Sequence, residues 1–276
     1  MDLKEKLIFD LREPDRRERA MDILSQQRQA FQDLGLLLWH SFGSVAVLLQ
    51  EIVSIYHELS PPTLSASASK RVCNALALLQ SIALHPETRH LLLNANIPVY
   101  LYPFLSIRMY TTPIEDLRLT SLGVIGTLVK VDDRESIRYL IETEVVPRCL
   151  LSMDFGSEIS KIVATFILHK ILMDDFGLQY ACNTAERYLA ISQTLWGMIA
   201  SHSGRPGKQL LKTIIRCFLR LSDHPRMTRK PGSGFKRSCV RLEFRQMGSI
   251  IINQGQKDIC MLPILVPGRK HTSILY

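Results

Sequence analysis

The stretch LQSIALHPETRHLLLNANIP, residues 79–98, is matched 49 residues later by LVKVDDRESIRYLIETEVVP, residues 128–147. In both copies an apolar helical stretch ends at a polar turn, a short amphipathic segment follows, and a proline comes last. Proline costs little in the first turn of a helix, where the N–H has no partner within the helix, so Pro98 and Pro147 should each open a further helix. Helical units of about 40 to 47 residues are typical of armadillo and HEAT arrays. The match therefore predicts a helical repeat, and equal proline offsets count against the alternative of chance similarity between two helical hairpins.

Apolar residues at three- and four-residue spacing extend this pattern over most of the chain. The predicted helices span residues 18–32, 45–56, 71–84, 117–130, 159–173, 187–200 and 210–221. Residues 173–177 and 222–226 resemble the polar turn of the repeat, and no alternating strand pattern precedes residue 230. Residues 61–69 and 108–113 are expected to be a linker and a loop. The predicted fold class is all-α, an armadillo-like helical repeat solenoid of about five to six repeats with the last truncated or altered.

Charge divides the 276 residues into two parts. Hydrophobic residues make up 46% and charged residues 22%, which is typical of folded proteins, and the net charge is +8. Residues 227–276 hold nine basic and two acidic side chains, so this segment carries +7 and residues 1–226 carry +1. The segment is also punctuated by glycine and loses the helical period. We expect an armadillo-like domain over 1–226 and a basic, disordered tail over 227–276.

Cysteine usage favours an intracellular protein. The six cysteines lie far apart without a C-x-x-C pair, which disfavours a zinc site or a disulfide framework. Cys73, Cys149, Cys182 and Cys217 lie among apolar neighbours, where a free cysteine usually acts as a small buried hydrophobe. The charged opening of the chain does not resemble a signal peptide.

The uncharged stretch 34–50 could be taken for a membrane span. It is slightly short for a bilayer and is interrupted by His40, Ser41 and Gly43. We therefore expect a buried pair of helices joined by a turn at residues 41–43, with no membrane partner.

Candidate catalytic groups are weak. Residues 232–238 contain glycines and a lysine but do not match a phosphate-binding loop, and His85 and His90 are not spaced to share one helix face. The acidic pairs at 115–116, 132–133 and 174–175 fall at turns or helix starts, where carboxylates stabilise exposed N–H groups. We expect no catalytic residue, no metal site and no cofactor.

Several longer motifs resemble one known family. They are WHSFG (39–43), LLQEI (48–52), PPTL (61–64), RVCNALALLQ (71–80), HPETR (85–89), LYPFL (101–105), LRLTSLGVIG (117–126), VATFIL (163–168) and RCFLRLSD (216–223). Together they resemble the "required for cell differentiation" family, also called Caf-forty, the armadillo-repeat subunit of the Ccr–Not deadenylase complex. The resemblance covers about residues 6–226.

The resemblance implies a non-catalytic adaptor with six armadillo-like repeats. Members of the family dock on the large Not scaffold subunit and recruit short motifs of translational repressors and RNA-binding proteins, so that the attached nucleases shorten the poly(A) tail. It thereby implies roles in mRNA decay, translational repression and transcription regulation, located in cytoplasmic P-bodies and in the nucleus. Whether the chain forms a homodimer is left open.

The resemblance also implies two binding sites. Scaffold contacts correspond to His40, Phe42 and Ala46, although apolar residues such as Phe42 and Ala46 are usually buried and could belong to the core. A groove for helical peptides corresponds to Gly123 and Val163, which could equally be ordinary helix-packing residues.

The chain departs from the family at three places. Asp116 replaces a tyrosine of the peptide groove, so a charge that opposes desolvation lies beside an apolar site. In the family's pockets for tryptophan, Arg187 and Arg226 are retained but Ala185 replaces a tyrosine. The usual closing helices are replaced by the unrelated tail. We expect these pockets to be impaired.

Direct binding of RNA or DNA is the alternative function. The tail's +7 charge would give non-specific, salt-sensitive affinity through counterion release. Its aromatic residues, Phe235, Phe244 and Tyr276, are few for a base-stacking platform. Salt-sensitive binding that disappears without residues 227–276 would favour this alternative over scaffold docking.

Overall fold

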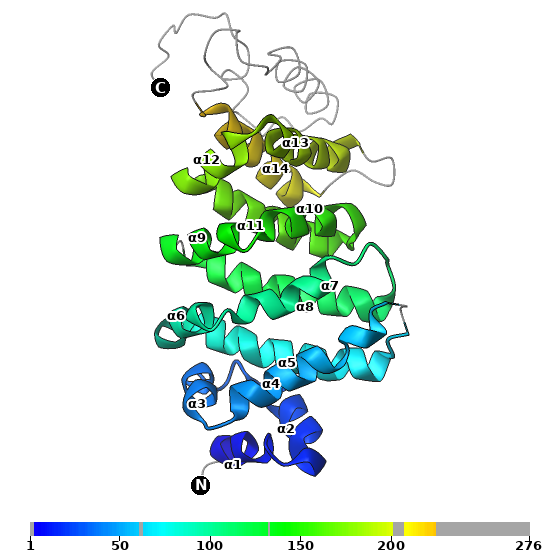
Figure 1. Cartoon of the computed structure of the whole chain (residues 1–276), viewed down its shortest axis with the longest axis vertical. Coiled ribbons are helices and arrows are strands. Elements are labelled where there is room, and N and C mark those ends of the chain that lie inside the picture. Colours follow the sequence, from blue (N-terminus) through cyan, green and yellow to red (C-terminus); the bar gives the residue numbers. More distant parts are fainter. Residues whose placement is uncertain (1–2, 61–62, 132, 201–206, 225–276) are drawn as a thin grey trace, which may run out of the picture. The chain divides into compact units, whose positions relative to one another are not determined.

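The computed structural model describes residues 3–60, 63–131, 133–200 and 207–224, and the regular structure in these ranges is helical without any strand (Figure 1). The all-α prediction is confirmed. Residue 226 and the tail 227–276 lie outside the described residues. The predicted domain boundary therefore stays a prediction.

The helices group into one pair followed by four three-part repeats. The bounds are α1 Leu3–Asp10 and α2 Pro14–Gln27; then α3 Leu34–His40, α4 Ser44–Ser54 with η1 Tyr56–Glu58, and α5 Ala66–Leu84; α6 Pro86–Asn94, η2 Ile97–Leu101 with α7 Tyr102–Leu105, and α8 Thr112–Lys130; α9 Arg134–Glu142, α10 Val145–Phe155 and α11 Glu158–Met173; α12 Asp175–Asn183, α13 Ala185–Ala200 and α14 Lys208–Ser222. The repeat inferred from residues 79–98 and 128–147 is therefore real, and each copy runs from a third helix into the next repeat.

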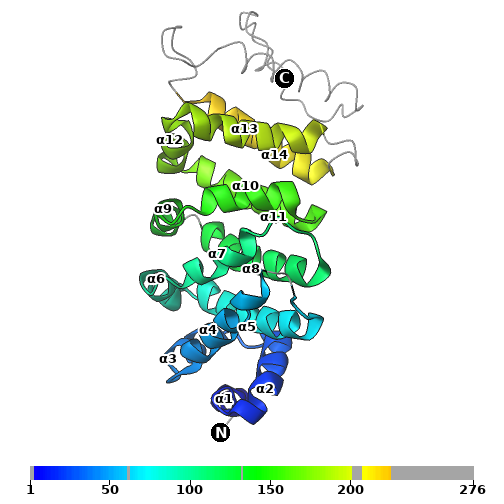
Figure 2. The ribbon, with the colours of Figure 1, turned by 45° about the vertical axis from the view of Figure 1, so that its right-hand side comes forward.

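Corresponding helices of successive repeats stack into three rows (Figures 1 and 2). The third helices α5, α8, α11 and α14 pack side by side, with α2 extending the row beyond α5. We call this row the ladder. In the view of Figure 1, α4, α7, α10 and α13 lie in front of it, and the short helices α3, α6, α9 and α12 form the left edge. The core lies between these rows.

Polar turns begin the short helices as expected. Asp133 accepts hydrogen bonds from the N–H groups of Glu135 and Ser136, both at 3.2 Å, and Asp174 caps α12 through Phe176 N–H at 2.9 Å. Such caps satisfy N–H groups that have no partner within the helix. The explanation offered for Asp133 and Asp174 is thus confirmed.

Glu115 is different from these capping acids. It is buried, and its carboxylate pairs with the guanidinium of Arg118, which is 0% exposed. Arg118 Nη2 also donates to the carbonyl oxygens of Ile107 (2.8 Å) and Met109 (3.1 Å), while Glu115 Oε1 accepts from Ser157 N–H at 2.8 Å. Glu115 thus lies in the first turn of α8, as expected, but its carboxylate accepts from an N–H group at the start of α11, and its pair with Arg118 joins the loop before α8 to α11.

Three helix starts fall four or five residues earlier than the apolar period predicts: α2 begins at Pro14 and also ends at Gln27, before the predicted residue 32, and α5 and α8 begin at Ala66 and Thr112. Residues 66–69 of the expected linker belong to α5, because the Ser65 hydroxyl accepts a hydrogen bond from Ala68 N–H at 3.1 Å and caps the helix. Similarly, the expected loop 108–113 ends at residue 111, where α8 begins.

The uncharged stretch forms α3 and α4, bent by 92° at the predicted turn. No single described helix has the length and apolar character to cross a membrane, although this bent pair passes that test when its two helices are taken together. The expectation of two helices joined by a turn is confirmed, but the pair is buried on one side only, since Phe42 of the turn and Val53 of α4 are exposed.

Candidate protein-docking surfaces

The turn between α3 and α4 projects a phenylalanine into solvent. Gly43 adopts φ +78°, a left-handed conformation that glycine adopts without strain, and α4 begins at the next residue. Phe42 is 87% exposed, and His40 and Ala46 are also exposed. The alternative in which Phe42 and Ala46 belong to the core is therefore wrong.

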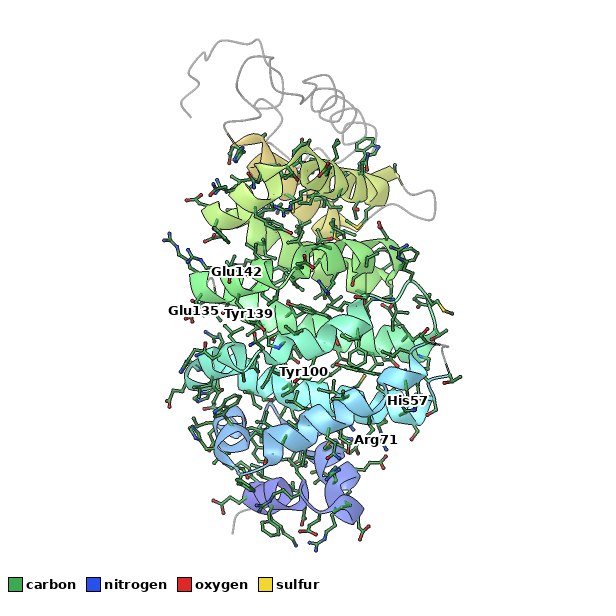
Figure 3. All side chains as sticks on the ribbon, in the orientation of Figure 1. His57, Arg71, Tyr100, Glu135, Tyr139 and Glu142 are labelled. Atoms are coloured by element: carbon green, nitrogen blue, oxygen red, sulfur yellow. The ribbon has the colours of Figure 1, made fainter. Side chains whose placement is uncertain are left out.

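The opposite side of α4 is firmly anchored. Leu48 and Ile52 are fully buried, and the carboxylate of Glu51 pairs with Arg17 at 3.2 Å and with Arg71, which is labelled in Figure 3, at 2.9 Å. The two arginines come from α2 and α5, so three helices meet at one carboxylate. The exposed residues of α4 thus project from a rigid support.

Further exposed apolar side chains lie beside α4. Val53 on α4 and Val99 and Tyr100 on η2 are each about two-fifths exposed, and η2 packs against α4. Tyr56 donates a hydrogen bond to the carbonyl oxygen of Tyr100, a residue labelled in Figure 3, and this bond joins η1 to η2. We call Phe42, Ala46, Val53, Val99 and Tyr100 the α4 surface. Sequence reasoning missed its last three members, because the helical period does not distinguish a partly exposed apolar residue from a buried one.

The second predicted site lies on the ladder. Gly123 on α8 and Val163 on α11 are both half-buried. A Cβ at Gly123 would lie 3.6 Å from Gln80 Nε2, and one at the neighbouring Gly126 would lie 3.8 Å from Val163 Cγ1. The structure therefore brings the two predicted residues onto adjacent helices, and Gln80 of α5 donates a hydrogen bond to the Gly123 carbonyl oxygen at 3.2 Å.

α11 continues this surface with an apolar stripe. Ile159 is 59% exposed and Ile162 41%, and the partly exposed Phe166 follows at helical spacing. Lys170 occupies the next position of the row, before Met173, which is 51% exposed. We call the exposed side of α8, α11 and α14 the ladder face. Exposed aliphatic residues grouped on one side of a helix are a feature of binding surfaces.

Asp116 lies on the same face at the first turns of α8. Its side chain is exposed, and its carboxylate makes no ion pair with any described residue. Burial raises the pKa of the nearby Cys73 thiol, and the negative charge of Asp116 raises it further. The predicted charge beside the apolar site is therefore present and uncompensated within the described chain.

The residues of the predicted tryptophan pockets are only partly described. The Arg187 guanidinium stacks over the Tyr180 ring at 4.2 Å from its centroid, so an arginine–aromatic pair remains where α12 meets α13. Ala185 is the exposed first residue of α13. Arg226 lies outside the described residues, so whether these pockets bind tryptophan stays a prediction.

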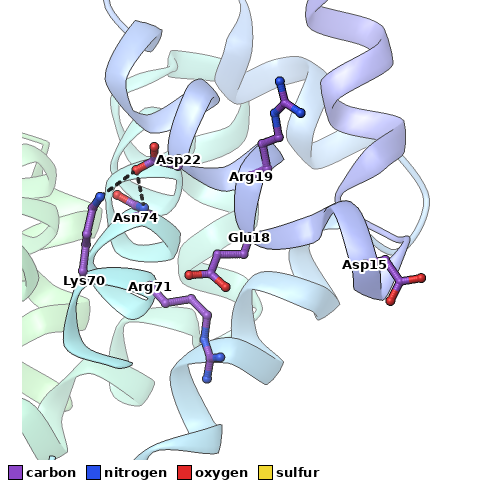
Figure 4. A pocket seen from close by; sticks show the side chains of 7 residues that line it. All are labelled: Asp15, Glu18, Arg19, Asp22, Lys70, Arg71 and Asn74. Carbon is purple, nitrogen blue, oxygen red and sulfur yellow. Dashed lines mark hydrogen bonds and ion pairs between the residues drawn. The ribbon is translucent and has the colours of Figure 1, made fainter. Parts of the chain in front are cut away.

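A polar cavity of about 430 Å³ lies between α2 and α5 (Figure 4). Acids from α2 face basic residues from α5: Lys70 pairs with Asp22 at 3.4 Å, and Asn74 donates to the same carboxylate at 3.2 Å. These interactions lower the pKa of Asp22, against the effect of desolvation. Three acidic and three basic side chains line this cavity, so it carries no net charge, and we assign no binding site to it.

The buried cysteines are poor nucleophiles. Burial raises the pKa of Cys149 to about 12 and also raises that of Cys217. The thiolate is the reactive form, so these thiols remain protonated and unreactive at neutral pH. Within the described ranges, no three His, Cys, Asp or Glu side chains come together as a metal site would require.

Comparisons with known proteins agree with this architecture. Residues 7–233 match the family described as "Cell differentiation family, Rcd1-like". Cell differentiation protein rcd1 of Schizosaccharomyces pombe is 55% identical over 210 residues, which cover 76% of this chain and 74% of that protein. Protein CAF40 of Saccharomyces cerevisiae is 53% identical over 209 residues, which cover 75% of this chain and 56% of that protein, so the match spans little more than half of its length.

Solved structures support the fold alone. A designed armadillo repeat protein in complex with the peptide (KR)4 superposes with a TM-score of 0.61 at 14% identity, covering 95% of each chain. A second designed armadillo repeat protein gives 0.60 at 15% identity, covering 94% of this chain and 92% of that one. The armadillo-like prediction is thereby confirmed.

Proposed function

The chain belongs to the Rcd1-like cell differentiation family, and on that premise we propose that it works as a non-catalytic adaptor of the Ccr–Not deadenylase complex. In this role the α4 surface docks on the Not scaffold, and the ladder face recruits short segments of repressors or RNA-binding proteins for mRNA deadenylation, decay and translational repression. The proposal places the protein in cytoplasmic P-bodies, with a nuclear fraction.

The single observation that supports scaffold docking best is the exposure of Phe42. Fully burying a phenylalanine on association contributes about 1.5–3 kcal/mol, and large aromatic residues dominate the energetics of protein interfaces. Here the aromatic ring projects from a turn fixed by Gly43, beside the small side chain of Ala46. A phenylalanine has two side-chain torsions to restrict, so its burial costs less conformational entropy than that of a longer, more flexible side chain.

The test is capture by the armadillo-binding segment of the Not scaffold. We expect the full-length chain to be captured and the His40→Ala/Phe42→Ala variant to be lost from the complex, with unchanged helical content and melting temperature because both side chains are exposed. Tyr110→Ala is the matched control, because Tyr110 is a 64% exposed aromatic residue on a different loop. Retention of the double variant, or equal loss of the Tyr110 variant, would refute docking through this turn.

Non-specific nucleic-acid binding through residues 227–276 remains the competing function. It predicts an affinity for single-stranded RNA that falls steeply with salt and is lost when these residues are deleted. Scaffold docking through apolar contacts predicts a complex that tolerates salt. Capture by the scaffold segment and capture by single-stranded RNA, each repeated from low to high salt, therefore separate the two functions.

A further inference from the structure

A second cavity, of about 230 Å³, lies between the short helices α9 and α12 at the left edge of Figure 1. Arg134 and Arg138 line it from α9, and Asp174, Asp175 and Phe176 line it from the start of α12. We call it the α9–α12 cavity. None of its five residues belongs to the α4 surface or to a ladder helix, so it is distinct from both surfaces described above.

Both arginines of this cavity are available to a ligand. They lie four positions apart, so they project from the same side of α9. Both are exposed, and neither forms an ion pair with any described residue. The guanidinium carbon of Arg138 lies 5.2 Å from the centre of the Phe176 ring, a cation–π contact that restricts where this guanidinium can point. Positive side chains one turn apart repel each other, and an anion bound between them would remove that repulsion.

The two aspartates of the cavity already have partners. Asp174 accepts hydrogen bonds from the N–H groups of Phe176 and Gly177, at 2.9 and 3.3 Å, and thereby occupies the donors at the start of α12. Asp175 pairs with Arg220 of α14. With Arg220 included, three positive and two negative side chains meet here, and both arginines of α9 lack a countercharge. An anion would therefore be held by these arginines and not by the helix start.

The two guanidinium groups suit a phosphate better than a carboxylate. A single guanidinium can bind both oxygens of a carboxylate through its planar fork of N–H groups, so a carboxylate leaves the second arginine without a partner. A phosphate monoester carries a charge of about −1.5 to −2 at neutral pH and has three acceptor oxygens. It can therefore accept hydrogen bonds from both Arg134 and Arg138 and neutralise both charges.

Acidic side chains around the arginines restrict the ligand to a single phosphate. Glu135 and Glu142, labelled in Figure 3, are exposed on the same helix, and Asp133 caps its start. RNA or an anionic membrane would bring further negative charges close to these carboxylates, and like charges brought together oppose binding. An isolated phosphate on a peptide avoids this repulsion, and the 39% exposed Phe176 offers an apolar contact to a neighbouring peptide residue.

We propose that the α9–α12 cavity binds a phosphorylated serine or threonine within a peptide segment of a partner protein. Arg134 and Arg138 share the phosphate, and Phe176 positions the Arg138 guanidinium. Recognition of phosphorylated segments by arginine clusters is a common mode of peptide binding. This site is additional to the two surfaces of the proposed function, and it makes association with its partner conditional on phosphorylation.

Two immobilised peptide libraries test this proposal. One has a central phosphothreonine between randomised residues, and the other has threonine at the same position. Retention of the full-length protein at about 0.15 M salt should be at least about tenfold higher on the phosphorylated library, because the other library lacks the charge-assisted hydrogen bonds to the phosphate. Free phosphothreonine should release the protein from the phosphorylated library.

Substitutions in the protein identify the residues responsible. Arg134→Gln/Arg138→Gln should abolish the preference, and each single variant should lower it, with an unchanged melting temperature because both side chains are exposed. Lys208→Gln/Lys212→Gln is the matched control, because it removes two exposed positive charges at the same spacing on α14 and should leave the preference intact. Phe42→Ala should also leave it intact, so this test is independent of capture by the Not scaffold.

Equal retention on the two libraries overturns the proposal. So does a preference that survives in Arg134→Gln/Arg138→Gln, since the phosphate would then bind elsewhere, for instance to the basic residues of segment 227–276. Equal loss in the Lys208→Gln/Lys212→Gln control would mean that only overall charge matters, which also refutes the site. Single-stranded RNA is the third probe, and RNA retention that disappears with the two arginines would assign them to nucleic acid instead.

Discussion

Replacing Arg118 by methionine should destabilise the whole repeat array, because this side chain joins three segments. The guanidinium is 0% exposed, pairs with Glu115 and donates to the carbonyl oxygens of Ile107 and Met109. Methionine fills a similar volume but leaves the Glu115 carboxylate buried without its countercharge. Removing one partner of a buried ion pair costs about 3–5 kcal/mol.

The corresponding fall in melting temperature is about 6–20 °C, because about 1 kcal/mol shifts the melting temperature of a domain of this size by 2–4 °C. Circular dichroism during thermal unfolding measures it. Adding Glu115→Gln to Arg118→Met removes the stranded charge, so the double variant should lose less stability than the sum of the single variants. The amide oxygen that Glu115→Gln introduces can still accept the hydrogen bond that Ser157 N–H now donates to the Glu115 carboxylate.

Arg134→Met is the control, because Arg134 is exposed at the start of α9 and forms no ion pair with a described residue. Its stability should change by about 0.5 kcal/mol or less. A melting temperature for Arg118→Met within about 2 °C of the parent would refute the reasoning. Strictly additive effects of the Glu115 and Arg118 changes would refute the coupling between them.

Three further predictions concern close packing, acid stability and thiol reactivity. Gly35→Ala should lower the melting temperature sharply, because its Cβ would lie 2.3 Å from the carbonyl oxygen of Ser81. Gly197→Ala is the control: its Cβ would meet nothing within 4 Å, so it should add up to about 1 kcal/mol of helix stability. Equal melting temperatures of the two variants would contradict this prediction. Burial opposes ionisation of Asp133, but hydrogen bonds from Ser136 and Glu135 lower its pKa overall. Because folding lowers this pKa, the ionised Asp133 stabilises the folded state above the ordinary carboxyl pKa, and this stabilisation is lost as the pH falls below about 4. In acid titrations, Asp133→Asn should therefore lose less stability than the parent protein. Cys149, with its pKa raised to about 12 by burial, should resist iodoacetamide at about pH 8 until denaturant is added, and mass spectrometry showing rapid native labelling would rule out its burial.

The repeat could be predicted from sequence because the same physical constraints recur in each copy. Pro98 and Pro147 both lie in the first turn of a helix, as expected. The residue before each of these helices was not anticipated: Asn96 has φ 54° and Glu144 has φ 61°. Asparagine often adopts this conformation, but glutamate does so rarely, so composition gives no signal for the second turn.

The sites were harder to predict than the fold, because exposure depends on neighbouring repeats. The apolar period around Phe42 is compatible with a core position, and only the Gly43 turn places the ring in solvent. Glu115 and Asp116 are adjacent acids, yet Glu115 is buried against Arg118 and Asp116 is exposed on the ladder face. Sequence indicates that both are acidic but not which way each side chain points once α8 has packed.

The two proposed docking surfaces lie on different rows of helices, and this separation determines how they can act together. Phe42 projects from the turn between α3 and α4, whereas Asp116 and Ile162 belong to the ladder. α5 packs against both α4 and α8, so it lies between the two surfaces and supports both. A ligand on one surface therefore need not displace a ligand on the other, and under the proposed function a scaffold and a recruited segment would bind simultaneously. The Glu51 carboxylate joins α4 to α2 and α5, so a partner that docks at Phe42 would contact a turn whose following helix is held by two neighbouring helices.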